Sequence, residues 1–230
     1  MKMKLIVAML VLPLFSTAQE YLGPMLSGNT LVLQNRTGNV ILEGKKGVEG
    51  TPWLSDEWAV GKISMDNGQV FDSLMLKFNM EHNVLLFLQN GSPYECANNV
   101  RDFTVTYSGV DAMETVQYRK NFPNINNHTT NTFYQLLADG PRLQLLCYRA
   151  KRYAETLVPN AAPRKHYTEI ADYYIYDSKT KTIQLIKPKK SSLVEALPEL
   201  EQQINTLCSD NGWKLKSWDE MKLLVMALRP

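Results

Sequence analysis

The histidines are the first residues to consider for chemistry, because imidazole serves as a general base and as a metal ligand. His82, His128 and His166 lie far apart, each in or beside a segment rich in turn residues. No two of them have the spacing of a metal motif, and the chain has no P-loop, no dinucleotide-binding glycine motif and no nucleophile elbow. The sequence therefore predicts no catalytic residue, no metal site and no cofactor.

Asp56 and Glu57 come nearest to the paired carboxylates of general acid–base catalysis, and they stand between Trp53 and Trp58. Adjacent side chains point in different directions, however, and an exposed acidic turn between two tryptophans explains the pair equally well. Such catalysis needs burial and a shifted pKa, which a sequence does not reveal. A hydrolase with an unrecognised site therefore stays as an alternative.

Basic residues are unevenly distributed. The chain has 25 basic and 23 acidic residues, and Lys2 and Lys4 account for the excess, so a nucleic-acid partner is not indicated. Residues 19–140 contain 8 basic and 13 acidic residues, whereas residues 141–230 contain 15 and 10. If neighbouring strands bring them together, eight basic side chains form an anion-binding or partner-binding surface: Arg149, Lys151, Arg152, Arg164, Lys165, Lys187, Lys189 and Lys190. The alternative is that they solvate strand edges and prevent aggregation.

Three cysteines allow at most one internal disulfide. The bond that we consider is Cys96–Cys147, and the alternative is three unpaired thiols. Cys208 falls on the apolar stripe of a predicted helix, where a small buried thiol is common.

Residues 1–18 have the pattern of a signal peptide. Two lysines precede an apolar centre, Pro13 interrupts it, and Ser16 and Ala18 supply the small residues of a cleavage site. We therefore expect a secreted protein of the periplasm or cell surface that starts at Gln19. No later apolar run approaches the roughly 20 residues of a membrane-spanning helix.

Residues 19–190 show the period of two that is typical of strands. Apolar Leu74, Leu76, Phe78 and Met80 alternate with polar residues, and the continuous apolar run Val84–Leu88 predicts a central strand. Hairpins are predicted around turn residues. They join Thr30–Gln34 to Asn39–Glu43, Gly61–Met65 to Val70–Asp72, Phe133–Ala138 to Leu143–Arg149, and Ile170–Tyr176 to Thr182–Ile186.

Residues 191–230 change to the helical period. Ser192 with Glu195, and Ser217 with Glu220, have the spacing of capping boxes, and Pro198 and Gly212 separate the helical stretches. The prediction is a mainly β (α+β) protein whose antiparallel hairpins form a curved sheet or partly open barrel, with a C-terminal helical pair packed on it. Pro159–His166 is predicted to be a basic connection.

The chain resembles a broad group of uncharacterised secreted proteins of Bacteroidota-type bacteria. The resemblance rests on spaced segments: Gly50–Leu54, Gly61–Ile63, Asn67–Gly68, Leu76–Asn79, Tyr173–Tyr176 and Lys187–Lys190. It implies a β-rich protein of the cell envelope, with no assigned activity and no catalytic residues to transfer.

These observations lead to three hypotheses of function. The first is a non-enzymatic envelope protein that binds a protein, glycan or lipid partner through a curved sheet. The second is a periplasmic lipid or glycolipid carrier, in which Leu74 to Met80 and Val84–Leu88 line a half-barrel and the helices form a lid. The third is the hydrolase, which requires converging carboxylates or a histidine–carboxylate pair in a cleft.

Overall fold

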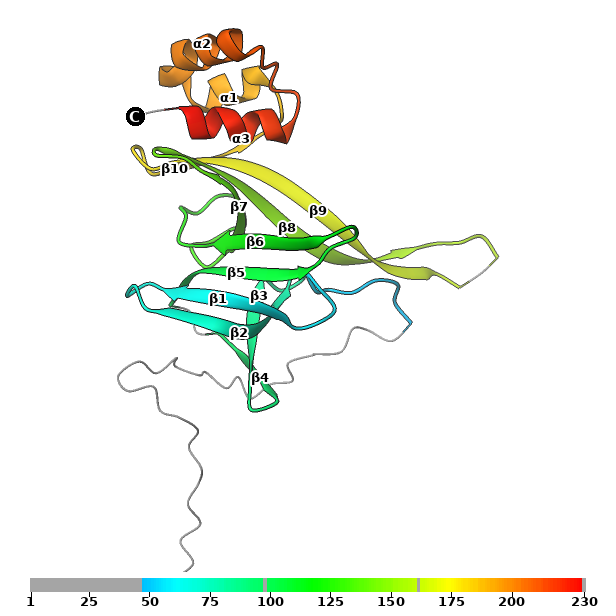
Figure 1. The fold of residues 1–230 in the computed structure, drawn as a ribbon. Helices are drawn as coiled ribbons and strands as arrows, with labels where there is room; N and C mark the ends of the chain where they lie inside the picture. Colours follow the sequence, from blue (N-terminus) through cyan, green and yellow to red (C-terminus); the bar gives the residue numbers. More distant parts are fainter. Residues whose placement is uncertain (1–46, 97–98, 161, 229–230) are drawn as a thin grey trace, which may run out of the picture. The chain divides into compact units, whose positions relative to one another are not determined.

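The computed structural model describes residues 47–96, 99–160 and 162–228, in which ten antiparallel strands form one open sheet (Figure 1). The predicted signal peptide and the predicted hairpin of Thr30–Gln34 and Asn39–Glu43 lie outside the described residues. The strands are β1 (Ala59–Met65), β2 (Val70–Asn79), β3 (Val84–Gln89), β4 (Ser92–Glu95), β5 (Val100–Ser108), β6 (Met113–Arg119), β7 (Tyr134–Asp139), β8 (Leu143–Thr156), β9 (Arg164–Asp177) and β10 (Thr182–Ile186). The mainly β prediction is confirmed, and the sheet is open rather than a closed barrel.

The strand order is β10-β9-β8-β7-β6-β5-β1-β2-β3-β4, so most neighbours in the sheet are also neighbours in the sequence. The exception is β5, which returns past β2, β3 and β4 to pair with β1. Three predicted hairpins are confirmed, namely β1 with β2, β7 with β8, and β9 with β10. The first turns at Gly68, whose φ of +86° suits glycine.

The strands β1 to β6 enclose an aromatic core. Phe78 from β2 lies 4.8 Å from Tyr118 of β6, and Phe103 of β5 stacks on Tyr118 with ring centroids 5.0 Å apart. The apolar residues of the alternating pattern in β2 point into this core. The run Val84–Leu88 forms β3, an inner strand between β2 and β4. Leu85, Leu86 and Phe87 are all buried, so both faces of the strand are covered as predicted, although it lies only one strand from the edge of the sheet.

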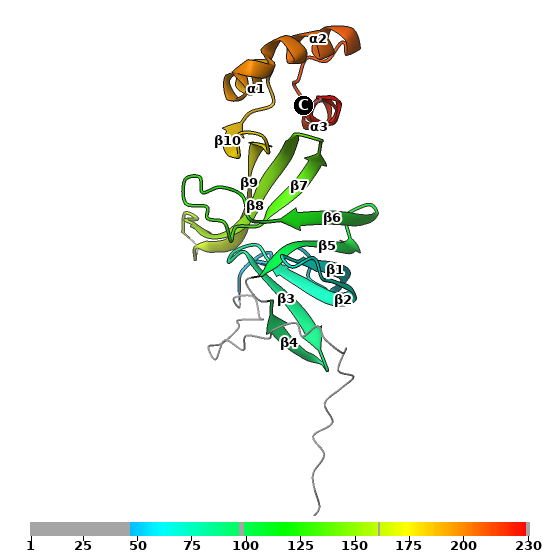
Figure 2. The ribbon, with the colours of Figure 1, turned by 90° about the vertical axis from the view of Figure 1, so that its left-hand side faces the viewer.

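A second core forms where helices pack on strands β7 to β10. The helices are α1 (Lys190–Ala196), the 3₁₀ helix η1 (Pro198–Leu200), α2 (Glu201–Asn211) and α3 (Trp218–Ala227). Figure 2 shows them together at one end of the sheet, beyond β7 and β10. Leu145 and Ile175 pack against α3 residues such as Leu224. Gly140 is required in the β7–β8 turn, because a Cβ atom there would lie 2.4 Å from the Val225 carbonyl oxygen.

Of the two predicted capping boxes, only the one at Ser217 caps a helix. Ser217 caps α3 by accepting a hydrogen bond from the Glu220 amide, and the Glu220 carboxylate accepts from the Lys216 amide. Ser192 does not cap a helix, since α1 begins at Lys190 and the Ser192 hydroxyl accepts from the Lys187 amide. Pro198 and Leu197 separate α1 from α2, so the structure has three α-helices instead of the predicted pair.

Strands β8 and β9 are each longer than predicted, and they pair in a hairpin that the sequence did not predict. The register of this hairpin runs from Leu143 opposite Asp177 to Thr156 opposite Arg164, so the predicted connection Pro159–His166 partly belongs to β9. Opposite residues share a face of the sheet, and faces alternate along a strand. We call the face of β8 and β9 that carries Leu145 and Ile175 the helix-side face. The opposite face of β8 and β9 is covered by the Phe122–Thr132 loop, which packs on Tyr134, Leu146 and Tyr174.

A buried ion pair connects the helical end to the strands. Arg142, in the β7–β8 turn, donates from Nε to Asp177 Oδ1 at 3.0 Å, and its NH2 also reaches Glu199 Oε1 in η1 at 2.5 Å. The Arg142 and Asp177 side chains are 5% and 1% exposed. The hydrogen bonds from Arg142 lower the pKa of Asp177 against the effect of burial.

We expect Asp177→Ala to lower the free energy of unfolding by about 3–5 kcal/mol, because it leaves the Arg142 charge buried beside only one acid. Asp139→Ala is the matched control, since Asp139 pairs with Arg119 at 3.1 Å but is itself 44% exposed, and its loss should cost less than about 1 kcal/mol. Urea unfolding of both variants gives the comparison. Equal losses would contradict this account of the buried pair.

Candidate functional site

The segment Glu49–Trp58, just before β1, joins two distant parts of the sheet. At its start, the Glu49 amide donates to the Lys165 carbonyl in β9 at 2.9 Å, and the Tyr167 amide donates to the Glu49 carbonyl at 3.0 Å. Further along, the Leu54 amide donates to the Phe78 carbonyl at 3.0 Å. One short stretch of backbone therefore pairs with both β9 and β2.

Side chains also hold this segment in place. The Thr51 hydroxyl donates to Asp56 Oδ1 at 2.6 Å, which closes the loop on itself. Lys151 Nζ of β8 donates to the Trp53 carbonyl, and Lys77 Nζ donates to the Asp56 carbonyl. Lys77 Nζ also lies 5.0 Å from the Trp53 ring centroid, a cation–π contact.

A cleft of about 620 Å³ opens between this segment and the β5–β6 hairpin. That volume is within the roughly 300–1,000 Å³ range of small-molecule sites. Its lining combines aromatic, hydroxyl and charged side chains. The lining includes Thr51, Trp53, Ser55, Asp56, Glu57, Trp58, Thr106, Tyr107, Ser108, Met113 and Lys151.

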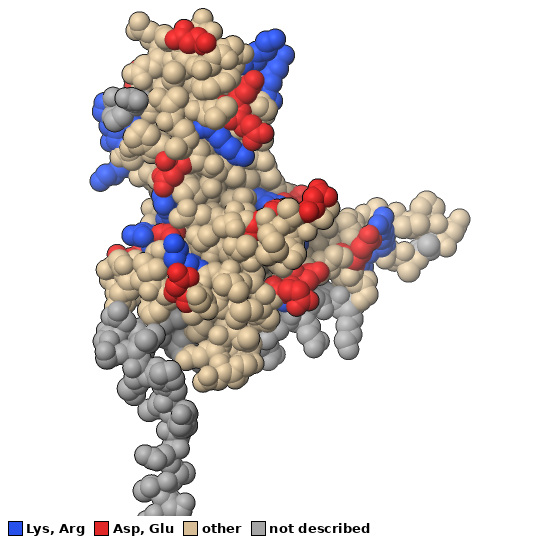
Figure 3. Space-filling view, viewed as in Figure 1, with Lys and Arg blue, Asp and Glu red and all other residues tan. Residues whose placement is uncertain are grey.

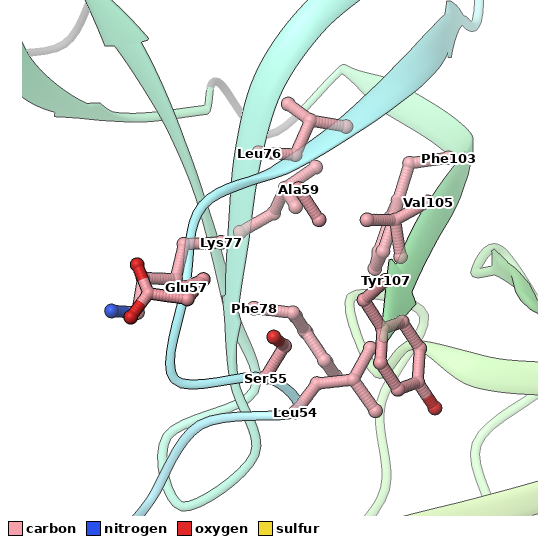
Figure 4. Close-up of a pocket in the computed structure, with 11 residues that line it drawn as sticks. Leu54, Ser55, Glu57, Ala59, Leu76, Lys77, Phe78, Phe103, Val105 and Tyr107 are labelled. Carbon is pink, nitrogen blue, oxygen red and sulfur yellow. The ribbon is translucent and has the colours of Figure 1, made fainter. Parts of the chain in front are cut away.

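The space beneath the segment, by contrast, is filled. Figure 4 shows Leu54, Phe78, Phe103 and Val105 directed toward one another, with the charged ends of Glu57 and Lys77 directed away from them. Only about 10 Å³ remains there, close to the smallest space that holds one water molecule. The apolar side chains that we expected to line a lipid cavity form a packed core.

Tyr107 connects the cleft to a polar network on the helix-side face. Its hydroxyl donates to Glu114 Oε2 at 3.0 Å, and burial and this carboxylate raise its pKa, while a hydrogen bond from Arg149 lowers it. Arg149 Nε donates to Glu169 Oε1 at 2.7 Å. Burial acts to lower the pKa of Arg149, but Glu169 and the tyrosines 118 and 107 raise it above its usual value.

Tyr118 adds an unusual group to this network. Its side chain is fully buried, and within the described part of the chain nothing hydrogen-bonds its hydroxyl. Arg149, Tyr107 and Cys147 are its electrostatic neighbours, and burial raises its pKa. A buried hydroxyl without a partner leaves one hydrogen-bonding position of the network open.

The structure does not bring the eight predicted basic residues into one surface. By register, Arg149, Lys151 and Lys165 lie on the helix-side face, and Arg152 and Arg164 lie on the other. Lys187, Lys189 and Lys190 come after β10, where α1 begins. Figure 3 shows basic and acidic side chains interspersed on the face that it displays.

Acidic residues also offset several of these charges. Arg149 pairs with Glu169, Arg164 NH2 lies 2.5 Å from Glu49 Oε2, and Lys165 Nζ lies 4.0 Å from a Glu155 oxygen. Burial lowers the pKa of Lys151, an effect that Glu169 and Asp56 oppose. Anion binding by this set remains a prediction without geometric support.

The cysteines are free thiols. Cys96 follows β4 at one edge of the sheet, Cys147 lies buried in β8, and Cys208 lies buried in α2. The Cys96–Cys147 disulfide that we considered is therefore absent. Burial raises the pKa of both the Cys96 and the Cys147 thiols, which disfavours the reactive thiolate form.

The histidines stay separate. His82 lies 3.8 Å from Glu81, and His166 is in β9. His128 sits in the Phe122–Thr132 loop among tyrosines, with Nδ1 2.7 Å from the Tyr134 hydroxyl and its ring 4.1 Å from that of Tyr148. Burial lowers its pKa, and Asp172 opposes this effect. No group of three or more metal-ligating side chains occurs among residues 47–96, 99–160 and 162–228.

The sequence drew attention to the residues of one wall of the cleft but not to those of the other. Trp53, Asp56, Glu57 and Trp58 stood out as aromatic and acidic neighbours, and all four line it. The opposite wall, with Tyr107 and Met113, gave no signal because these residues look like ordinary strand positions. Only the long-range pairing of the Glu49–Trp58 segment brings the walls together.

The chain was compared with protein-family models, with curated proteins and with solved structures, and none of these comparisons finds a match. The resemblance to secreted proteins of Bacteroidota-type bacteria stays a prediction. The site must therefore be interpreted from its own geometry.

Tyr118→Phe tests whether its hydroxyl lacks a partner. We expect the free energy of unfolding to stay the same or to rise by about 1 kcal/mol, since an unsatisfied buried polar group is destabilising. Tyr134→Phe is the matched control and should cost about 1 kcal/mol, because it removes the hydrogen bond to His128. A comparable loss in Tyr118→Phe would show that its hydroxyl is satisfied, for example by a buried water molecule.

His128 should make stability depend on pH. Because its pKa in the folded protein lies below its ordinary value of 6.5, the unfolded chain binds the proton more readily. The contribution of His128 is therefore complete above pH 6.5 and is lost as the pH falls through the lower folded-state pKa. Urea midpoints between about pH 7 and about pH 5 should fall less in His128→Gln than in the parent chain. Identical slopes for His128→Gln and the parent chain would refute the assignment.

Proposed function

We propose that this chain is an exported, non-enzymatic protein of the cell envelope that binds a ligand in the cleft between the Glu49–Trp58 segment and the β5–β6 hairpin. The observation that carries the proposal is the cleft itself, about 620 Å³ and lined by Trp53, Trp58 and Tyr107 with a few polar groups. A cavity of this size with convergent polar groups is the default binding site of a protein. Export rests on the signal-peptide pattern of residues 1–18.

A non-enzymatic role is favoured by the side chains around the cleft. Among the described residues that line the cleft, Asp56 and Glu57 are the carboxylates, and Asp56 accepts a hydrogen bond from Thr51. No histidine or cysteine lines the cleft within the part of the chain that the structure describes. The hydrolase alternative therefore depends on Asp56 and Glu57 alone.

The packing of the strands and helices gives little support to the alternative of a lipid or glycolipid carrier. Leu76, Phe78, Met80, Leu85 and Phe87 are buried in the core of β1 to β6. The helices, which would form the lid, pack on Leu143, Leu145 and Ile175 instead. An acyl chain in that core would have to displace packed side chains, at a large cost in free energy.

Native mass spectrometry of the chain, expressed with residues 1–18 and purified from the periplasm, tests the proposal. We expect the mass of a chain that starts at Gln19, with an additional bound mass that is lost on denaturation. Trp58→Ala should abolish or reduce the bound mass, because it removes one aromatic wall of the cleft. Trp213→Ala, a half-buried tryptophan packed against the helical core, should retain it.

Two results would count against the proposal. An uncleaved chain that stays in the cytoplasm would contradict export. A bound mass that Trp58→Ala leaves unchanged would place the ligand outside this cleft.

A further inference from the structure

We infer that the cleft binds an uncharged, polyhydroxylated ligand, namely a neutral glycan chain. This inference rests on the proposed function and adds the chemical class of the ligand. It follows from three properties of the lining: its aromatic walls, its balance of charge and its hydroxyl groups.

Aromatic side chains from two parts of the chain line the cleft, and Trp58 is the most accessible of them, because Trp53 and Tyr107 are only 4% and 9% exposed. Trp58 and Trp53 come from the segment before β1, and Tyr107 comes from β5. Tryptophan and tyrosine present a flat apolar body together with a polar group. A sugar ring has the matching character, because its C–H groups form apolar patches and its hydroxyls lie around the edge.

The charges of the lining argue against a charged ligand. Asp56, Glu57 and Lys151 all line the cleft, Asp56 is an electrostatic neighbour of Lys151, and Lys77 donates to the Asp56 carbonyl. Both lysines already donate to backbone carbonyls, Lys151 to Trp53 and Lys77 to Asp56. Anion sites need uncommitted donors, and a cation at the two tryptophans would meet the ammonium of Lys77, which lies 5.0 and 5.9 Å from their ring centroids.

The hydroxyl groups argue against an acyl chain. Thr51, Ser55, Thr106 and Ser108 line the cleft together with Tyr107. Four of these hydroxyls already have a partner within the protein: Thr51 donates to Asp56, Thr106 bonds Thr115, Ser108 donates to Met113 and Tyr107 donates to Glu114. Each hydroxyl oxygen keeps a lone pair that can accept a hydrogen bond from a sugar hydroxyl, and an acyl chain would leave that capacity unused. Behind Tyr107, the Glu114, Arg149 and Glu169 side chains fix the orientation of its phenol.

The inference can be tested with the purified mature chain and a panel of neutral oligosaccharides, including β-linked glucose and N-acetylglucosamine oligomers. We expect at least one to quench tryptophan fluorescence with a saturable Kd. Trp58→Ala should weaken this Kd by about tenfold or more, as truncation of an aromatic anchor does, whereas Trp213→Ala should leave it unchanged. Raising the salt concentration from about 0.05 to about 0.5 M should have little effect, since no ion pair is formed.

The possible failures are distinguishable from one another. If no neutral glycan binds in a Trp58-dependent way, the inference is overturned. If an anionic glycan, a peptide or a lipid binds instead and depends on Trp58, the glycan class is wrong while the proposed ligand-binding function stands. If every ligand found binds equally well to Trp58→Ala, the cleft is not the site and both proposals fail.

Discussion

The pairing of the Glu49–Trp58 segment with two distant strands is the constraint on which the site depends. Its backbone bonds to Lys165 and Tyr167 of β9 at one end and to Phe78 of β2 further along. Those strands are separated in the sheet by β8, β7, β6, β5 and β1. The segment can reach both only because the sheet twists enough to bring them near each other, and the cleft wall is the product of that approach.

One sheet supports two cores of different character. Strands β1 to β6 bury an aromatic cluster around Phe78 and Phe103, while the helical end buries mostly aliphatic residues around Leu145 and Ile175. Between them, on the helix-side face, lie Arg149 and Glu169. Unlike the buried Arg142–Asp177 pair, this pair is partly open to solvent, with Arg149 27% and Glu169 40% exposed, so it loses less hydration on folding.

Local patterns predicted local structure well. The alternation in β2, the Asn67-Gly68 turn and the Ser217 cap each depend on a few neighbouring residues, and each appears in the structure. The extension of β8 and β9 was missed, because the residues Lys151–Thr156 and Arg164–Glu169 are too polar to resemble buried strands. Their pairing depends on strand register, which a pattern of hydrophobicity does not contain.

The candidate site was harder to predict for the same reason. Trp53 and Trp58 are conspicuous in the sequence, yet their partners across the cleft come from β5, β6 and β8. Charge density alone suggested one basic surface, but alternation places Lys151 and Arg152 on opposite faces. What the cleft can bind depends on which side chains the strand order brings together. Those side chains are far apart in the sequence, so local patterns do not predict them.

The ion pair between Glu49 and Arg164 joins residues 115 positions apart in the chain, whereas most strand pairs join neighbours in sequence. Closing a long loop costs chain entropy before the contact contributes any energy. We therefore expect such contacts to form late in folding and to open first on unfolding. We therefore expect the Glu49–Trp58 wall of the cleft to open before the sheet beneath it. A bound ligand that touches both walls would stabilise this docking step, and ligand affinity and the hydrogen-exchange protection of residues 49–58 would rise and fall together.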